Sequence, residues 1–233
     1  MNEYFYKEHP KTCDPDDYWG QVKRTINGKP VTQDQIDMIV AAVCDGVDLA
    51  RDDFLLDLCC GNGALTSYFF QRCAGGVGVD FSEFLVDIAK QRFSKRPSEE
   101  YLLRDALDYV KHCDRPERFT KAVCYGAFMF FPADSAAELL VVLRRRFTSL
   151  ASLFIGNLPD KGRIADFFHD GEYRDGIEDD ATSPTGIWRT ADEFVRISEA
   201  AGWSASIRRM PPSFYAAHYR FDAVLVPKPP VDR

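Results

Sequence analysis

The stretch FLLDLCCGNGALTSYFF, from Phe54 to Phe70, joins an apolar run to a segment with helical spacing. Its first part, FLLDLC, is typical of a buried β-strand, and the apolar residues of its last part recur on one helical face. Gly61 and Gly63 lie at the junction, where two missing Cβ atoms let a ligand approach the main chain closely. The helix that follows offers backbone N–H groups that have no partner within the helix. The stretch therefore predicts a strand, a ligand-binding turn and a helix, which together form the basic unit of an α/β sheet.

The same alternation continues along the chain. Further strand-like runs are GGVGVDF, EEYLLRDA, FTKAVCYGAFMFF and SLASLFIGNLP, and helix-like runs such as SEFLVDIAKQRF and SAAELLVVLRRRF separate them. Crossover connections of this kind imply a parallel sheet, and near-continuous apolar strands imply that both of its faces are buried. The two closing runs, SASIRRM and RFDAVLVP, have only PPSFYAAHY between them, so we expect them to pair antiparallel.

Residues 1–50 precede this pattern and are predicted to form an N-terminal helical cap. A helix is expected from Thr32 to Ala50, with Thr32 as its N-cap and Gln35 at the capping-box position. Ser82 is the expected N-cap of the helix that follows the second strand.

The remaining residues, 51–233, are predicted to form one α/β domain, as a chain of 233 residues allows. Residues 160–190 are polar, rich in glycine and aspartate, and too long for an ordinary connector. Such segments are usually functional lids or disordered loops, and we predict a lid insertion here.

Composition excludes several classes of protein. The net charge of −7 is poorly suited to a phosphate backbone, so no nucleic-acid partner is expected. No apolar run reaches the ~18 residues of a membrane span, and the N-terminus lacks the pattern of a secretory signal, so no membrane partner and a cytoplasmic location are expected. The seven cysteines include no C-x-x-C pair, which argues against a zinc site or a disulfide framework and predicts no bound metal.

Three acids end three successive predicted strands: Asp57, Asp80 and Asp105. An acid at the end of the second strand can accept both hydroxyls of a ribose, and Phe81 beside it can pack on a flat base. The alternative is that each acid is a helix cap or a turn residue. Thr66 occupies the place of the third glycine in the G-x-G-x-x-G fingerprint, which argues mildly against a pyrophosphate ligand.

The motifs LLDLCCGNGALT, GVGVDFSEFLVDIA, LLRDALDYV and FTKAVCYGAFMFF together resemble the successive motifs of class I S-adenosylmethionine-dependent methyltransferases. The resemblance covers roughly Asp53 to Pro159. It implies a Rossmann-like, doubly wound α/β fold with a seven-stranded sheet, mostly parallel with an antiparallel last strand. It also implies S-adenosyl-L-methionine as the cofactor and S-adenosyl-L-homocysteine as its product.

The resemblance implies where the amino-acid part of this cofactor lies. Asp57 would support the first loop and the amino end, and Gly61 and Gly63 would let the methionine part lie on the backbone. Cys59 and Cys60 would be small residues where the chain lies flat against the ligand. A redox role for these two cysteines is the alternative, but no charged activator stands beside them.

The resemblance also implies the contacts of the adenosine and of the methyl group. Asp80 would hold the ribose hydroxyls, Phe81 would flank the adenine, and Asp105 with Ala106 would read the adenine edge. Tyr125 would line the side where the methyl group is transferred. The acidic rim and the aromatic faces suit a cationic sulfonium.

The substrate is predicted less directly. CYGAFMFFP follows the fourth strand in place of an Asn-Pro-Pro-Tyr-type signature, which argues against methylation of base amino groups. We therefore expect a methyltransferase acting on a small molecule, on oxygen in a natural-product or sugar-modifying pathway. The alternatives are N-methylation of a small amine and a non-catalytic cofactor-binding partner subunit. The sequence leaves open whether the protein forms a homodimer.

Two further features remain as candidates. His169, in the suspected lid, is the first choice for a general base; the alternative is a solvated surface histidine. Tyr18, Trp19 and Gln21 either fold over the cofactor or merely cover apolar surface.

Overall fold

The computed structural model describes residues 3–168 and 172–229, with side chains from residue 6 onward. Its strands are β1 (Thr25–Ile26), β2 (Lys29–Pro30), β3 (Phe54–Leu58), β4 (Gly75–Asp80), β5 (Glu99–Leu103), β6 (Lys121–Tyr125), β7 (Ser152–Pro159), β8 (Trp203–Arg208) and β9 (Arg220–Pro227). Its α-helices are α1 (Glu3–Glu8), α2 (Tyr18–Gln21), α3 (Gln33–Val47), α4 (Ala64–Phe70), α5 (Glu83–Ile88), α6 (Ala106–His112), α7 (Ala133–Arg146) and α8 (Ala191–Ala200). Short 3-10 helices are η1 (His9–Thr12), η3 (Pro116–Arg118), η4 (Phe128–Phe130), η5 (Lys161–Asp166) and η6 (Ile177–Asp179), and η2 (Ala89–Phe93) is a π-helix that continues α5.

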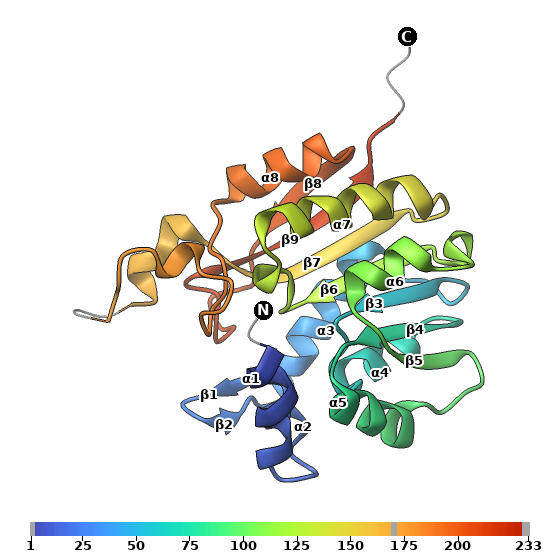
Figure 1. Cartoon of the computed structure of the whole chain (residues 1–233), viewed down its shortest axis with the longest axis horizontal. Helices are drawn as coiled ribbons and strands as arrows, with labels where there is room; N and C mark the ends of the chain where they lie inside the picture. Colours follow the sequence, from blue (N-terminus) through green and yellow to red (C-terminus); the bar gives the residue numbers. More distant parts are fainter. Residues whose placement is uncertain (1–2, 169–171, 230–233) are drawn as a thin grey trace.

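Seven strands form one sheet in the order β5-β4-β3-β6-β7-β9-β8 (Figure 1). Neighbours from β5 to β7 pair parallel, and β9 pairs antiparallel with both β7 and β8. The predicted Rossmann-like α/β fold with an antiparallel last strand is therefore confirmed. The strand order reverses between β3 and β6, and in open α/β sheets ligands bind beside the carboxyl ends of strands at such a point.

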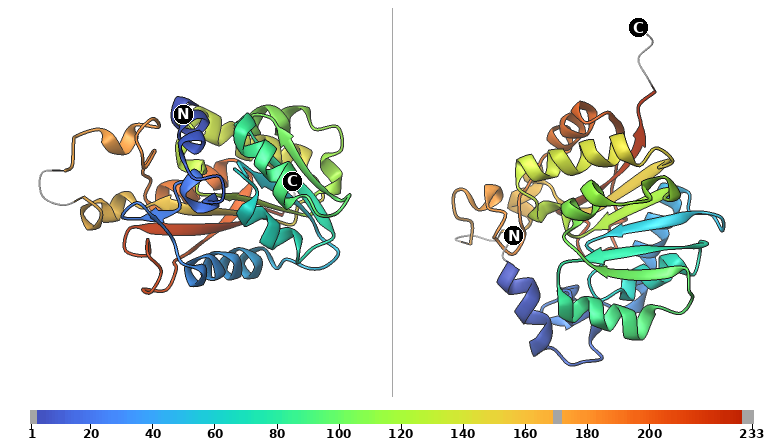
Figure 2. Two further views of the ribbon diagram at one scale, coloured as in Figure 1. Left: turned by 90° about the horizontal axis from the view of Figure 1, so that it is seen from below. Right: turned by 45° about the vertical axis from the view of Figure 1, so that its right-hand side comes forward.

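Helices cover both faces of this sheet (Figures 1 and 2). Helices α6, α7 and α8 pack on one face around a core that includes Phe119, Phe147 and Trp203. Helices α3, α4 and α5 pack on the other face around a second core that includes Phe69 and Phe154. Burial of both faces explains why the strands read as almost unbroken apolar runs.

Thr32 and Ser82 occupy the predicted N-cap positions, but the side-chain hydrogen bonds expected of the caps and of the capping box do not form. Thr32 precedes α3 but makes no side-chain cap hydrogen bond. Gln35 instead donates to Ser213 O and accepts from Tyr215 N, so a long-range contact replaces the capping box. Ser82 is the N-cap residue of α5, but its hydroxyl donates to Tyr6 O at 3.2 Å and not to the helix.

The fourth predicted strand is also shorter than expected. Strand β6 ends at Tyr125, and the apolar residues after Ala127 form η4. The run FMFF is apolar because it is buried beside the sheet, which gives the same hydrophobic signal as a strand.

The described part of residues 160–190 packs against the domain. Arg189 forms an isolated bridge with Asp160, and Ile187 N donates to Met129 O at 2.8 Å. Trp188 is only 1% exposed and contacts Phe167 and Tyr219. The division of the chain at residue 50 and the lid function of this insertion stay predictions.

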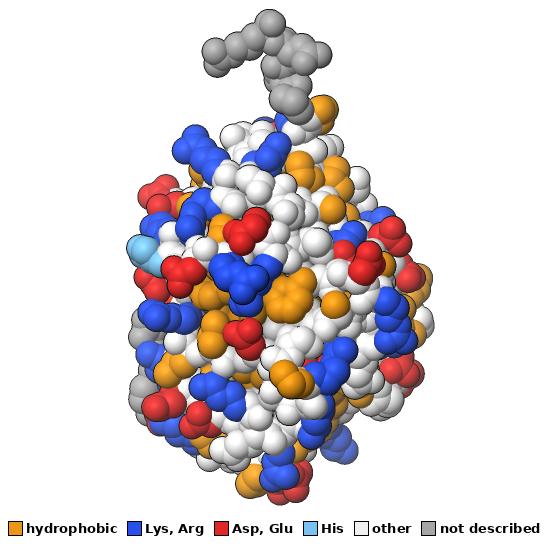
Figure 3. All heavy atoms as spheres, turned by 90° about the vertical axis from the view of Figure 1, so that its right-hand side faces the viewer, with side chains coloured by type: hydrophobic (Ala, Val, Ile, Leu, Met, Phe, Trp, Pro, Cys, Tyr) orange, Lys and Arg blue, Asp and Glu red, His pale blue; other side chains and the backbone are white. Residues whose placement is uncertain are grey.

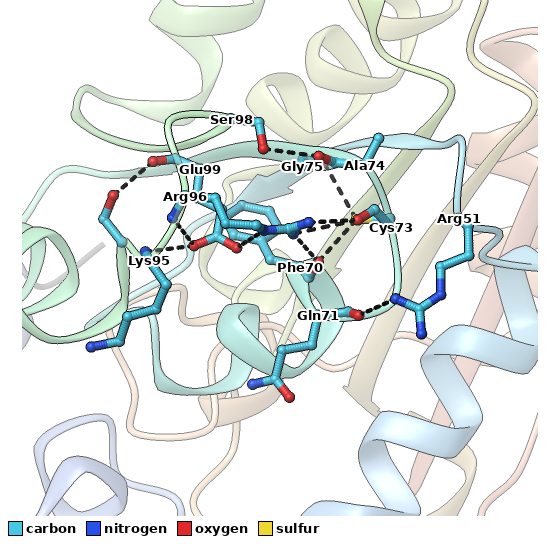
Figure 4. A network of polar contacts seen from close by, with 11 residues as sticks. Arg51, Phe70, Gln71, Cys73, Ala74, Gly75, Lys95, Arg96, Ser98 and Glu99 are labelled. Atoms are coloured by element: carbon cyan, nitrogen blue, oxygen red, sulfur yellow. Dashed lines mark hydrogen bonds and ion pairs between the residues drawn. The ribbon is translucent and has the colours of Figure 1, made fainter.

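A polar network ties α4 to the start of β5 (Figure 4). The Arg96 guanidinium donates to the carbonyls of Phe70 and Cys73, and its Nε lies 2.6 Å from Glu99 Oε1. Glu99 Oε2 accepts from Lys95 N at 2.7 Å. The network satisfies carbonyls at the end of α4, where no intrahelical donors remain.

The surface in Figure 3 shows basic and acidic side chains intermixed with small apolar areas, without a field of one sign on that face. Among residues 3–168 and 172–229, no helix has the length and apolarity needed to cross a membrane. The same residues contain no group of three or more His, Cys, Asp or Glu side chains placed to hold a metal ion.

Candidate functional site

The loop after β3 has the unusual backbone that the two glycines predict. Gly61 has φ +57° and Gly63 has φ +77°, in the left-handed region that favours glycine, and Cys59 also has φ +60°. A Cβ on Gly63 would lie 2.9 Å from both Ala89 Cβ and the ring of Tyr101. Gly63 is therefore required by the close packing of α4, independently of any ligand.

Asp80, at the end of β4, fixes this loop. Its carboxylate accepts from Gly61 N and from Ser82 N, each at 2.9 Å. The side chain is buried, and burial raises its pKa to about 6 although these hydrogen bonds oppose the shift. The acid thus joins the ends of β3 and β4 at the rim of the site.

Asp57 lies beneath the loop and is 4% exposed. Thr66 Oγ1 donates to Asp57 Oδ2 at 2.6 Å. Burial raises the pKa of Asp57 to about 7, and the positive charge of Arg24 acts in the opposite direction. Thr66, which stands in place of a third glycine, is therefore the hydrogen-bond partner of this carboxylate.

The N-terminal segment docks directly on the glycine loop. Asn62 Nδ2, between the two glycines, donates to Tyr18 O at 2.8 Å and to Gln21 Oε1 at 2.9 Å. Gln21 is fully buried and donates in turn to the carbonyls of Asp14 and Pro15. Tyr18 and Gln21 therefore anchor the segment beside the loop.

These elements enclose a pocket with about 720 Å³ of empty space, open solvent included. It lies at the carboxyl ends of β3, β4 and β6, where the strand order reverses. Six of the predicted cofactor residues line it: Asp57, Cys59, Gly61, Asp80, Phe81 and Tyr125. The sequence prediction missed other lining residues, among them Tyr6, Val22, Arg24, Asn62, Gly126 and Phe130.

Three predicted residues are not part of the pocket lining. Gly63 begins α4, and Ala106 is buried in the core under α6. Asp105 is exposed and caps α6, with its carboxylate accepting from Leu107 N and Asp108 N. The cap explains this aspartate by itself, so its contact with adenine stays a prediction. His169, the predicted base, lies outside the described residues.

The two adjacent cysteines are half-buried in the pocket wall and are not activated. Cys60 has a raised thiol pKa because of burial. The pKa of Cys59 is raised first by a hydrogen bond with Cys124 and then by burial. A raised pKa disfavours the reactive thiolate, which argues against a redox role.

Beyond the glycine loop, the side chain of Tyr125 extends across β7. Its ring lies over Gly156, where a Cβ would be only 2.4 Å from the ring. Its hydroxyl is buried and has no hydrogen-bond partner among the described residues. An unsatisfied buried hydroxyl is rare in proteins and calls for an explanation, and in a pocket wall a bound molecule can provide the missing partner.

Asn157, which follows Gly156, also has a buried side-chain atom without a hydrogen-bond partner in the described part of the chain. The pairing of β7 with β9 shifts register between Ile155 and Leu158, and Asn157 in this bulge has φ +64°. Asp222 accepts from Asn157 N at 2.7 Å and the Arg220 guanidinium donates to Asn157 O. The side-chain Oδ1 is buried without a partner among the described residues. Bulges often redirect a side chain next to an active site.

Comparison with known proteins agrees with this geometry. A family model described as a methyltransferase domain matches residues 55–148, from β3 to the end of α7. Ribosomal RNA small subunit methyltransferase A of Geobacter metallireducens is 36% identical over 70 residues, 30% of this chain and 26% of the relative. The alignment therefore spans about a quarter of that relative's length.

Solved methyltransferase structures share the fold over most of the chain. Magnesium protoporphyrin IX methyltransferase from Synechocystis PCC 6803 with bound S-adenosylmethionine has a TM-score of 0.59 at 17% identity, covering 97% of this chain and 94% of that one. A DhpI-SAM-HEP complex has a TM-score of 0.64 at 15% identity, covering 96% and 94%. The 1,6-didemethyltoxoflavin-N1-methyltransferase of Burkholderia thailandensis, with bound S-adenosylhomocysteine, has a TM-score of 0.58 at 16% identity, covering 84% and 79%. At these identities the likeness shows the fold.

Residues 55–148 therefore match a methyltransferase domain, and the chain has the fold of solved methyltransferase structures, as its motifs predict. Solved structures of this fold contain S-adenosylmethionine or S-adenosylhomocysteine, and the predicted enzyme class and cofactor agree with this. The comparisons do not identify the acceptor molecule or the atom that is methylated.

Proposed function

We propose that this protein transfers the methyl group of S-adenosyl-L-methionine to an oxygen atom of a small molecule in a biosynthetic pathway. The observation that carries the proposal is the carboxylate of Asp80 at the end of β4, bonded to the glycine loop at the reversal of strand order. A buried acid at this place suits a ribose, because each remaining oxygen lone pair can accept from a hydroxyl.

The pocket residues fit this cofactor. Asp80 accepts the ribose hydroxyls, the ring of Phe81 flanks the adenine, and the backbone at Gly61 lies along the chain that leads to the sulfur. The bound cofactor supplies an electrophilic methyl group on a sulfonium. The protein's part is to fix the two reacting groups in line and to exclude water.

The acceptor binds beside Tyr125 and Asn157, on the opposite side of the methyl group from the adenosine. Tyr125 can donate a hydrogen bond, and Asn157 Oδ1 can accept one. An acceptor hydroxyl has both a lone pair and a proton, so it satisfies both atoms at once. The hydroxyl oxygen has a second lone pair for the methyl group, whereas a neutral amine would use its one lone pair on the hydrogen bond from Tyr125, so this arrangement favours oxygen.

Methylation of RNA is the second candidate, because the curated relative is a ribosomal RNA methyltransferase. The net charge of −7 opposes it, since binding to a phosphate backbone is dominated by Lys and Arg contacts. A non-catalytic partner subunit is the third candidate and predicts cofactor binding without turnover.

Calorimetry with S-adenosylmethionine and S-adenosylhomocysteine tests the first step, and formation of S-adenosylhomocysteine over a panel of hydroxylated small molecules, small amines and RNA tests the second. We expect both compounds to bind and a hydroxylated acceptor to be methylated. Binding of neither compound would reject the proposal, and binding without turnover on any acceptor would favour the partner subunit.

A further inference from the structure

Arg220 lies beside the proposed acceptor site and has no carboxylate in contact. It is the first residue of β9, paired with Pro159 at the end of β7, and its guanidinium donates to Asn157 O. Among the described side chains of residues 6–168 and 172–229, no Asp or Glu lies within ion-pair distance of it. The side chain is half-buried, so most of its five N–H donors remain for water or for a ligand.

Asn157 connects this arginine to the acceptor. Its backbone oxygen accepts from Arg220, and its side-chain Oδ1 is the buried atom that the acceptor hydroxyl is proposed to satisfy. The Nδ2 atom of the same side chain lies 3.6 Å from the position of a Cβ built on Gly126, which lines the pocket. A single residue therefore separates the guanidinium from the pocket wall, and a substituent on a molecule bonded to Asn157 can reach it.

A second arginine approaches from the opposite direction. Arg24 lines the pocket with its central carbon 5.5 Å from the ring centre of Tyr125. Burial raises the pKa of the Tyr125 and Tyr215 hydroxyls, and the positive charges of both arginines oppose this rise. Burial also raises the pKa of Asp222, to about 6, so this nearby carboxylate is ionised at neutral pH and offsets one of the two positive charges. The acceptor end of the pocket therefore keeps a net positive charge.

This positive charge discriminates between the acceptors considered above. The protein as a whole carries a net charge of −7 and attracts cations from a distance. At the acceptor site, however, an ammonium group would meet two guanidinium groups, whereas a carboxylate or a phosphate would be attracted to them. The planar fork of arginine matches both anions, and the packing of Arg220 on Tyr219, 4.7 Å from the ring centre, helps to fix its orientation.

We propose that the methyl acceptor is an acidic small molecule, whose hydroxyl group binds between Tyr125 and Asn157 and whose carboxylate or phosphate binds Arg220. This assignment rests on the methyltransferase function proposed above and adds the chemical class of the acceptor. Arg24 contributes to the positive potential from the other side of Tyr125. The alternative is a purely structural arginine that only holds the backbone of the bulge at Asn157.

Pairs of probes that differ in one acidic group test the proposal on the full-length protein. With S-adenosylhomocysteine at saturation and constant ionic strength, the melting temperature is measured with 4-hydroxybenzoate or 4-hydroxybenzamide, and with glucose 6-phosphate or glucose. We expect the acidic member of at least one pair to raise the melting temperature more than its neutral counterpart, because it binds the folded state more tightly. The pair that shows the difference distinguishes a carboxylate site from a phosphate site.

Arg220→Gln should remove this preference. In calorimetry we expect the affinity for the acidic probe to fall about tenfold, because a charged hydrogen bond is lost, while the affinity for its neutral counterpart changes less than about twofold. Arg220→Lys should keep part of the preference, because it keeps the charge and loses the fork. Arg196→Gln is the matched control, since it removes the same charge at an exposed residue of α8.

The outcomes separate this proposal from the function on which it rests. If neither pair shows a preference in the wild-type protein, or if Arg220→Gln weakens both members of a pair equally, the acidic acceptor is rejected while S-adenosylhomocysteine still binds. If Arg220→Gln does not fold, a reduced preference in Arg220→Lys supports the proposal and an unchanged one rejects it. If S-adenosylhomocysteine itself does not bind, the methyltransferase function fails and the acceptor assignment fails with it.

Discussion

The two halves of the pocket differ in how their polar atoms are satisfied. On the proposed cofactor side, Asp80 and Asp57 already have hydrogen-bond partners within the protein. On the proposed acceptor side, Tyr125 Oη in the pocket wall and Asn157 Oδ1 behind Gly126 are buried and have no partner among the described residues. The protein thus maintains the shape of the cofactor side itself, whereas the acceptor side leaves hydrogen bonds for the substrate to make.

The largest effect is expected from Asp80→Ala. It removes a charged acceptor for the ribose and the support of Gly61, so the affinity for S-adenosylhomocysteine should fall at least about tenfold in calorimetry. Asp87→Ala, an equal change in charge at an exposed position of α5, is the control. Unchanged affinity in Asp80→Ala would show that Asp80 does not bind the ribose. The difference between the cofactor side and the acceptor side of the pocket would then have no support.

Tyr125→Phe should impair methyl transfer and leave cofactor binding nearly unchanged. Loss of the hydroxyl should lower methyl transfer to a hydroxylated acceptor by about tenfold, while the affinity for S-adenosylhomocysteine changes less than about twofold. The melting temperature should stay the same or rise, because the hydroxyl has no partner whose loss would cost stability. A lower melting temperature with normal turnover would show that the hydroxyl is structural.

The smallest expected effect is on the pH dependence of stability. Asp57 has a pKa of about 7 and Asp80 one of about 6 when folded, against 3.8 when unfolded. Between pH values of about 4 and 7 the folded state therefore binds more protons than the unfolded state, and the contribution of these groups to the free energy of unfolding falls as pH rises. A bound ammonium group favours ionised Asp57, so a fixed concentration of S-adenosylhomocysteine should raise the melting temperature more at about pH 8 than at about pH 5.5.

In this measurement 5′-methylthioadenosine serves as the control, because it lacks the ammonium group and should show a weaker dependence on pH. An equal rise at both pH values for S-adenosylhomocysteine would mean that Asp57 does not contact the ammonium group.

The same contrast separates what the sequence could predict from what it could not. The cofactor side consists of strand ends and the turns that follow them, and each turn is encoded by a few neighbouring residues. Asp57, Gly61 and Asp80 therefore stood out, and the structure brings them together. Asp105 matched its motif as well, yet the helix cap that it forms produces the same local pattern.

The acceptor side depends on residues that are distant in sequence. Asn157 adopts its conformation because Asp222 and Arg220 of β9 hold its backbone, and nothing near GNLPD signals this. Arg24 reaches the pocket because Asn62 holds its segment. The predicted capping box at Thr32 does not form for the same physical reason, because Gln35 bonds to the backbone of the distant residues Ser213 and Tyr215 and not to that of Thr32.

The hydrogen bond from Thr66 to Asp57 also bears on which nucleotides the protein accepts in a cell. It keeps a carboxylate under the turn where dinucleotide-binding proteins receive a diphosphate at the start of the helix. Like charges would repel each other there. We therefore expect this turn to disfavour the diphosphate of a dinucleotide, whereas a donor with a positive charge at this end meets no such barrier.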